Sequence, residues 1–152
     1  MKTRKTGFTL VEILIVVIIL GILAAIVIPQ FTEASNDARE SSLVSNLQTL
    51  RSQCELYKVQ HLDEYPDVGA ADGTVFVTRM NTKTDDTHLA GGNLGPYLQQ
   101  FPSNPFNGLN TVRLDGAAAG ANTEGWRFDT ALGQIVADDG GTSPDGTLHA
   151  DL

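Results

Sequence analysis

The feature that most constrains this chain is an apolar run close to its N-terminus, about 21 residues from Phe8 to Ile28. A helix of this length measures about 32 Å at 1.5 Å per residue, enough to cross a hydrocarbon core of roughly 30 Å. Thr9 and Glu12 carry the only polar side chains of the run. A carboxylate inside an inserted helix is costly and usually marks a function with a partner charge. The sequence therefore predicts a membrane helix with one functional acid.

Basic residues flank this run unevenly. Three lie before it: Lys2, Arg4 and Lys5. Only Arg39 lies near its far end. Because positive flanks stay in the cytoplasm, we expect a cytoplasmic N-terminus and an exported C-terminal domain. An ordinary secretory signal peptide is the alternative, but it needs no Glu12 and has a polar region before its cleavage site, whereas this run continues to Ile28.

The partner charge for the acid would come from a cut between Gly7 and Phe8, which creates an α-amine four residues before Glu12. The pair could form within one chain or between neighbouring copies. Residues 5–12, Lys-Thr-Gly-Phe-Thr-Leu-Val-Glu, resemble the cleavage and methylation motif of type IV pilins and type II secretion pseudopilins. The resemblance implies that residues 1–7 are a leader and that a prepilin peptidase cuts after Gly7 and methylates Phe8. It also implies that Glu12 guides subunits into a helical filament.

Beyond the apolar run the pattern becomes amphipathic. One stripe recurs at helical steps of four and three, namely Leu43, Leu47, Leu50, Cys54, Tyr57 and His61. Polar residues occupy the opposite face: Arg39, Glu40, Gln48, Arg51, Gln53, Glu55 and Lys58. We predict one helix from Phe8 to about Leu62, with residues 8–29 in the membrane or filament core and residues 30–62 continuing into a globular domain. A two-helix coiled coil is the alternative.

Two residues interrupt this long helix, Gly21 and Pro29. Glycine lowers helix propensity and proline removes a backbone hydrogen bond, so the residues alone predict a kink where the helix leaves the membrane. The family resemblance implies more, that the segment between them bends or partly melts in the assembled filament. Both residues are therefore candidate assembly positions.

The remaining residues, 63–152, predict a small head of α+β class, with an antiparallel sheet packed on the second half of the helix. The expected elements are a strand or an Asp72-capped helix at 74–80, a helical turn begun by Pro96, a strand at 112–114 and a hairpin of 125–129 and 134–137. Four side chains are expected to face the helix: Val112, Trp126, Phe128 and Ile135. The segment 97–108 resembles a Tyr-Leu, Pro and Asn/Asp-Pro-aromatic turn of type II secretion major pseudopilins, with Phe106 where those proteins more often have Trp.

The C-terminal tail collects four aspartates among glycines: Asp138, Asp139, Asp145 and Asp151. Clustered carboxylates and backbone carbonyls are ligands for calcium. Major pseudopilins that this chain resembles bind calcium in a C-terminal Gly/Asp loop, so the resemblance implies a possible calcium site, although the spacing matches no EF-hand. The alternative is a solvated, flexible acidic tail. We expect no other cofactor to be required.

Several classes of function are disfavoured. The formal charge is −8, and it becomes −11 for a chain that starts at Phe8, which disfavours binding to nucleic acid. The single cysteine, Cys54, excludes an intrachain disulfide and is expected to be a buried apolar residue, with pairing between chains as the alternative. No phosphate loop, CxxC pair, HExxH or nucleophile elbow occurs, and His61 is expected to be a packing residue. We therefore expect no enzyme.

These features together predict a structural subunit of a type II secretion pseudopilus, a filament that helps move proteins across the outer membrane. The precursor would be a single-pass inner-membrane protein with its C-terminal domain in the periplasm. Its partners would be copies of itself in the filament, the prepilin peptidase, other pseudopilins and the inner-membrane assembly platform. One alternative is a type IV pilus subunit for adhesion, motility or DNA uptake. Another is a lone signal-anchored binding domain.

Overall fold

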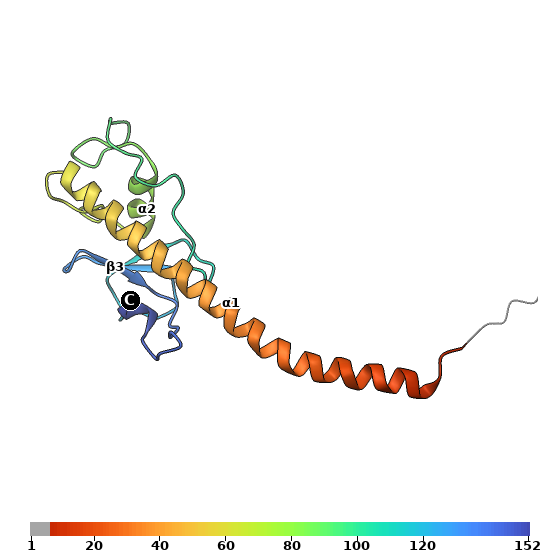
Figure 1. Cartoon of the computed structure of the whole chain (residues 1–152). Coiled ribbons are helices and arrows are strands. Elements are labelled where there is room, and N and C mark those ends of the chain that lie inside the picture. The colour runs from red at the N-terminus through yellow and green to blue at the C-terminus, as the bar shows by residue number, and fades with distance from the viewer. Residues whose placement is uncertain (1–6) are drawn as a thin grey trace, which may run out of the picture. The chain divides into compact units, whose positions relative to one another are not determined.

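The computed structural model describes residues 7–152 (Figure 1), so the predicted leader lies outside the described residues except for Gly7. The chain divides after Ala38 into two compact units. The elements, in order, are α1 (Leu10–Gln60), α2 (Gly73–Asn81), β1 (Val112–Leu114), β2 (Trp126–Asp129), β3 (Gln134–Ala137) and the short 3₁₀ helix η1 (His149–Asp151). The α+β class is confirmed.

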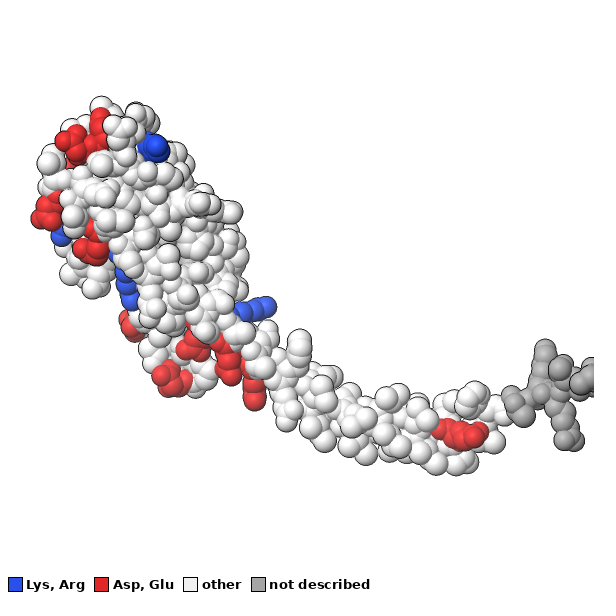
Figure 2. Space-filling view, turned by 45° about the horizontal axis from the view of Figure 1, so that its top comes forward, with Lys and Arg blue, Asp and Glu red and all other residues white. Residues whose placement is uncertain are grey.

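The N-terminal unit consists of the first part of α1, and its apolar side chains are not covered. Every large apolar residue from Leu10 to Ile28 is more than half exposed. Figure 2 shows this stretch as an almost uniformly uncharged surface, interrupted by an acidic group near its start. A helix that is apolar on all sides needs lipid or other chains around it. Among the described residues, α1 is the one helix long and apolar enough to span a membrane.

Helix α1 is continuous through both predicted interruptions. Pro29 lies inside the helix, where it has no N–H to donate. Close to it, the hydroxyl of Thr32 donates to the carbonyl oxygen of Ile28 at 3.1 Å. Bending or melting between Gly21 and Pro29 within a filament stays a prediction, since it concerns the assembled state.

The end of α1 is set by two residues in the left-handed region. The helix ends at Gln60, two residues before the expected end, and is followed by Leu62 (φ 56°) and Asp63 (φ 69°). The N–H of Asp63 donates to the carbonyl of Lys58 at 3.1 Å. This bond satisfies one of the free carbonyls of the last turn and turns the chain away from the helix axis.

The core of the head forms around the predicted stripe of α1. All six stripe residues are buried, as are the four side chains expected to face them from the strands. Phe76 and Met80 of α2 and Phe101 complete the same cluster. The indole N–H of Trp126 donates to the carbonyl of Pro102 at 2.9 Å, so this large ring is buried with its polar atom paired. The stripe prediction and the core-facing residues are confirmed.

One residue of the predicted polar face of α1 takes part in the packing of the head. The side chain of Arg51 is partly buried in the head and bonds to backbone carbonyls of the sheet and of the C-terminal segment. Arg51 was expected on the polar face opposite the stripe, but its side chain reaches into the head. Helical spacing placed it at the border of the stripe, and a long arginine side chain crosses such a border easily.

The sheet is mixed rather than antiparallel. Its order is β1-β2-β3; β2 and β3 form the predicted antiparallel hairpin, but β1 pairs with β2 in parallel, with Val112 opposite Trp126. The short turn between β2 and β3 is closed by Asp129, whose carboxylate accepts from the N–H groups of Ala131 and Leu132. The longer connection between β1 and β2 lets the chain return to the same end of the sheet.

Two further expectations are resolved in the middle of the chain. Residues 73–81 form helix α2, whose N-cap Asp72 accepts from the N–H groups of Thr74 and Val75, so the strand alternative was wrong. The prediction of a helical turn begun by Pro96 was also wrong. The N–H groups of Tyr97 and Leu98 both donate to the carbonyl of Met80 at 3.0 Å, which uses these donors to close the end of α2 instead of a new helix.

Candidate functional site

The predicted cleavage and assembly residues lie at the start of the described chain. Gly7, Phe8 and Thr9 precede helix α1 and have no regular secondary structure. The side chain of Phe8 is 84% exposed, and a methyl group added at Gly7 would meet nothing within 4 Å. None of the described residues therefore covers the bond between Gly7 and Phe8. The basic residues 2–5 lie outside the described residues.

Glu12 closes the first turn of its own helix together with Thr9. One carboxylate oxygen of Glu12, Oε2, accepts from the N–H of Thr9 at 2.9 Å and from its hydroxyl at 2.7 Å. In return, the Oγ1 of Thr9 accepts from the N–H of Glu12 at 3.2 Å. This reciprocal pair is a capping box, which satisfies free donors at the start of a helix. The sequence signal was available as Thr-x-x-Glu before an apolar run, but it was not used in the sequence prediction.

The capping box leaves half of the carboxylate available. The other oxygen of Glu12, Oε1, takes no hydrogen bond from any residue in the described range 7–152. A carboxylate binds a cation through either oxygen, so Glu12 is able to cap its helix and accept an amine at the same time. The geometry therefore suits the predicted pairing with a Phe8 amine.

The predicted calcium residues divide into separate groups. Asp138 is 0% exposed and pairs with Arg113 at 2.7 Å, and Asp139 pairs with His149 at 2.7 Å. Asp145 is exposed and accepts from the N–H of Thr147, and Asp151 lies in η1. Within residues 7–152, no group of three or more His, Cys, Asp or Glu side chains gathers where it could hold a metal ion.

The alternative of a solvated, flexible tail does not hold for the whole segment, because Asp138 and His149 are buried. Burial opposes ionisation of Asp138, but the Arg113 guanidinium and nearby N–H donors outweigh it and keep the pKa of this carboxyl below its ordinary value. Asp138 is therefore a charged, fully paired group inside the head.

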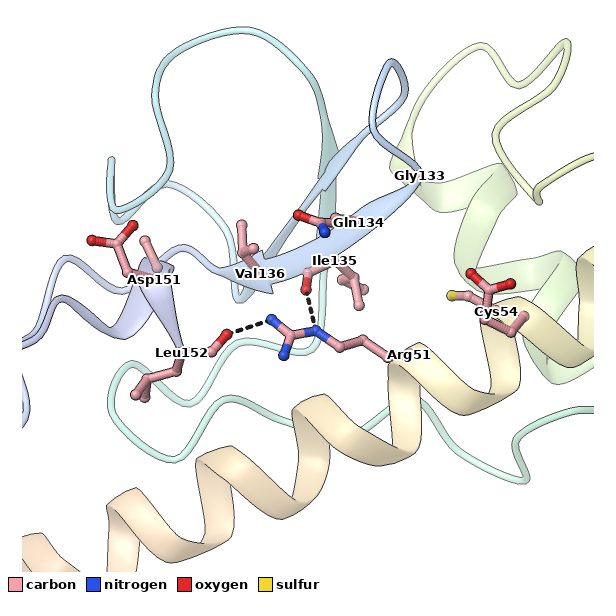
Figure 3. Close-up of a pocket in the computed structure, with 10 residues that line it drawn as sticks. Arg51, Cys54, Gly133, Gln134, Ile135, Val136, Asp151 and Leu152 are labelled. Carbon is pink, nitrogen blue, oxygen red and sulfur yellow. Dashed lines mark hydrogen bonds between the residues drawn. The ribbon is translucent and has the colours of Figure 1, made fainter.

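A pocket of about 540 Å³ lies between α1, the outer edge of β3 and the C-terminal residues (Figure 3). Arg51 extends into it from α1. Its Nε donates to the carbonyl of Ile135 at 3.2 Å, and its Nη2 donates to the carbonyl of Leu152. Glu55 and Asp151 add acidic groups to the lining. The bonds of Arg51 tie the end of the described chain to the sheet, which is a structural task.

Cys54 and His61 behave as core residues. Cys54 is 1% exposed, and burial raises the pKa of its thiol to about 12, so it stays protonated and out of reach of another chain. Both ring nitrogens of His61 have partners, the carbonyl of Tyr57 at 2.8 Å and the hydroxyl of Thr84 at 2.9 Å. The expectations of a buried cysteine and of a packing histidine are confirmed.

A hydrogen-bond chain near the end of α1 was not predicted. The hydroxyl of Tyr57 lies 2.7 Å from Nδ1 of His88, whose Nε2 lies 2.8 Å from a carboxylate oxygen of Glu64. Burial raises the pKa of Tyr57 to about 12, so its hydroxyl is a poor nucleophile. The chain of bonds ties the loop around His88 to α1. No short-range sequence signal shows this link, because it joins residues 31 positions apart.

Residues 2–28 match the family model described as "Prokaryotic N-terminal methylation motif". The chain is 30% identical to the type II secretion system core protein G of Dickeya chrysanthemi, over 70% of this chain and 66% of the relative. It is 32% identical to the protein of the same name from Vibrio cholerae serotype O1, over 69% of this chain and 68% of the relative. It is 38% identical to the protein of the same name from Pectobacterium carotovorum subsp. carotovorum, over 68% of this chain and 63% of the relative.

No solved structure matches the chain significantly. The aligned parts span about two thirds of the length of these relatives. They share one name, and the prepilin motif stands at the position where the exposed apolar helix begins. The chain therefore belongs to the family of type II secretion system core protein G, the major pseudopilins.

Proposed function

We propose that this chain is the structural subunit of a type II secretion pseudopilus. Prepilin peptidase removes residues 1–7 and methylates Phe8. The mature subunit then leaves the membrane and stacks with other copies in a helical filament that helps move proteins across the outer membrane. The observation that carries the proposal is the combination of an uncovered apolar helix with Glu12, whose Oε1 is available four residues from the new amine.

The apolar part of α1 needs a low-dielectric environment at both stages. Before assembly that environment is the lipid bilayer, and afterwards it is the packed helices of neighbouring copies. An unpaired carboxylate is strongly disfavoured in either place. Pairing of Glu12 with the Phe8 amine of a neighbour satisfies both charges and sets the axial register between copies.

The charge distribution supports the orientation and the partners. The basic residues Lys2, Arg4 and Lys5 favour a cytoplasmic N-terminus, where the assembly platform and the peptidase meet the inner membrane. The acidic head then lies in the periplasm. The role is structural, and the hydrogen-bonded groups of the head serve its packing.

Intact and N-terminal mass spectrometry of the membrane-extracted protein tests this proposal. We expect a chain that starts at Phe8 and carries one added methyl group. A chain that retains Met1 would favour a plain membrane anchor, and one that starts near Ile26 would indicate a secreted domain. Either of these two results would overturn the proposal.

The same N-terminal motif also occurs in type IV pilins, so a second test must distinguish a type II secretion system from a type IV pilus. Deletion of the gene should stop the export of proteins across the outer membrane while leaving twitching motility intact. The opposite pattern would assign the chain to a pilus instead.

A further inference from the structure

The segment from Asp138 to Asp151 places acidic groups where water is excluded. Two of its carboxylates, those of Asp138 and Asp139, have side chains that are 0% and 2% exposed. A buried carboxylate is stable only with a countercharge and with hydrogen bonds on its oxygens. A bound calcium ion is one way to supply both. The structure provides a countercharge and hydrogen bonds for Asp138, and hydrogen bonds for Asp139, from its own groups.

Asp138 has no room left for a metal. Its oxygens accept from Nη2 and Nε of Arg113 at 2.7 and 3.4 Å and from the N–H of Ala121 at 3.1 Å. The hydroxyl of Thr123 at 3.1 Å and the N–H of Glu124 at 3.3 Å donate to it as well. A carboxylate has about four acceptor positions, so those of Asp138 are filled.

The Arg113 guanidinium binds oxygen atoms of the type that calcium binds. Its Nη1 donates to the carbonyls of Asp115 and Ala117, and its Nη2 donates to the carbonyl of Ala118 at 3.2 Å. Together with the Asp138 carboxylate, these three carbonyl oxygens form the mixture of ligands expected around a hard cation. Here the cation is a side chain, and it holds the loop after β1 against the residue that follows β3.

Asp139 is satisfied by hydrogen bonds with three residues of the head. Its Oδ1 accepts from the N–H of Gly141 and lies 2.7 Å from Nδ1 of His149. Its Oδ2 accepts from the side-chain amide of Asn104 at 2.7 Å. The ring of His149 packs on Phe106 with centroids 4.2 Å apart. The loop is thus tied to the turn at residues 104–106.

We infer that the C-terminal loop of this head is closed by two side chains of its own, Arg113 on Asp138 and His149 on Asp139, and that it folds without a calcium ion. The four aspartates singled out in the sequence do not fit a calcium site in this arrangement. Arg113 and His149 were not among the candidate residues. The inference concerns the head alone, so its outcome does not depend on whether Glu12 directs assembly.

The full-length protein in detergent provides the test, because Trp126 is the single tryptophan of the chain and is buried in the head. Thermal unfolding is followed by its fluorescence in EDTA and in calcium at about 10 mM, above the roughly 10⁻³ M dissociation constants of weak extracellular sites. We expect the same midpoint in both. A filled site would raise the midpoint by several degrees, and that rise would overturn the inference.

Equilibrium dialysis against calcium gives a second reading that requires no unfolding. We expect less than one calcium ion bound per chain at this concentration. Stoichiometric binding that is lost in the Asp138→Asn variant would contradict the inference directly.

Arg113→Met tests the positive part of the inference, with Arg127→Met as the matched control. Arg127 lies opposite Arg113 on the neighbouring strand and also pairs with an aspartate, Asp129, at 3.1 Å. We expect Arg113→Met to lower the midpoint by several degrees more than Arg127→Met, equally in EDTA and in calcium. Equal losses for the two variants would show that Arg113 has no special role. If Arg113→Met does not fold, His149→Gln replaces it in the same comparison.

Discussion

Glu12 is engaged on one side only, and this defines its role at the scale of a single residue. Oε2 belongs to the capping box with Thr9, whereas Oε1 accepts no hydrogen bond from residues 7–152. The acid therefore stabilises the start of its own helix in the free subunit and still offers a site for a cation. In the proposed filament, the side chain that caps the helix would also make the contact with the next copy.

Replacement of Glu12 by valine should separate cleavage from assembly. The peptidase acts on the bond before Phe8, which lies outside the helix, so removal of the leader should continue. Filaments should be lost, because the Phe8 amine of each copy would lack its partner. Immunoblots of the sheared filament fraction and of the membrane fraction measure the two steps. Glu33→Val, a change of another exposed acid of α1, is the control, and normal filaments from Glu12→Val would exclude the proposed pairing.

The lowered pKa of His61 predicts how the stability of the head depends on pH. Burial is the main reason why the pKa of this histidine is lowered, and the nearby His88 acts in the same direction, while Asp85 and the carbonyl of Tyr57 oppose it. The neutral ring is therefore favoured in the folded state. The unfolded chain gains the proton first as the pH falls below about 6.5, so the stability that this group contributes is present above that value and lost below it.

We expect the unfolding midpoint to fall between pH 7 and pH 5 and to fall less in His61→Gln, which keeps hydrogen-bonding capacity without titrating. The carboxylates of the head with lowered pKa are Asp85, Asp129, Asp138 and Asp145, and they lose their contribution only below their ordinary range near pH 4, outside this window. Trp126 fluorescence at a series of pH values gives the midpoints. Parallel pH profiles for the two proteins would contradict the assignment to His61.

At the scale of elements, the packing of α2 on β1 depends on one glycine. A methyl group at Gly73 would lie 1.6 Å from the carbonyl oxygen of Val112, an impossible approach. Glycine is therefore required by the close contact of the two backbones. Residues 73–81 form a helix here because Asp72 caps its start and because Phe76 and Met80 enter the core.

Gly73→Ala should destabilise the head by about 3 kcal/mol or more, because α2 must move away from β1 and lose packing around Phe76. Thr78→Ala on the exposed side of α2 is the control and should change stability by no more than about 0.5 kcal/mol. Urea unfolding followed at Trp126 compares the two variants. A small effect of Gly73→Ala would mean that α2 shifts without loss of core contacts.

The elements also show what sequence patterns reveal. The stripe of α1 and the hairpin of β2 and β3 were predictable, because helical spacing and turn residues act over short distances. The parallel pairing of β1 depends on how a loop closes around Arg113. The path of the chain after Pro96 depends on the free carbonyl of Met80. Such long-range hydrogen bonds leave no period in the sequence. At the candidate site, the residues of the motif were predictable, whereas Arg113 and His149 were not.

At the scale of the whole molecule, the boundary after Ala38 separates a unit with an exposed apolar surface from a unit with a buried core. Every buried apolar residue of the core lies beyond it, from Leu43 onward. The unit before it has a large exposed apolar surface, which must be covered by lipid or by other copies. We therefore expect the first unit to drive the proposed assembly and the second unit to fold on its own core.

A protein that comprises residues 39–152 should therefore be soluble and monomeric without detergent, because it retains the complete core stripe and leaves out the exposed apolar helix. Its Trp126 emission should match that of the full-length protein, since the indole is buried and bonded to Pro102 within this unit. Size-exclusion chromatography with light scattering measures the mass, and fluorescence measures the fold. The full-length protein without detergent is the control and should aggregate. If residues 39–152 also aggregate or show the red-shifted emission of exposed tryptophan, the head requires the N-terminal unit for its fold. That result would contradict the prediction that the second unit folds on its own core.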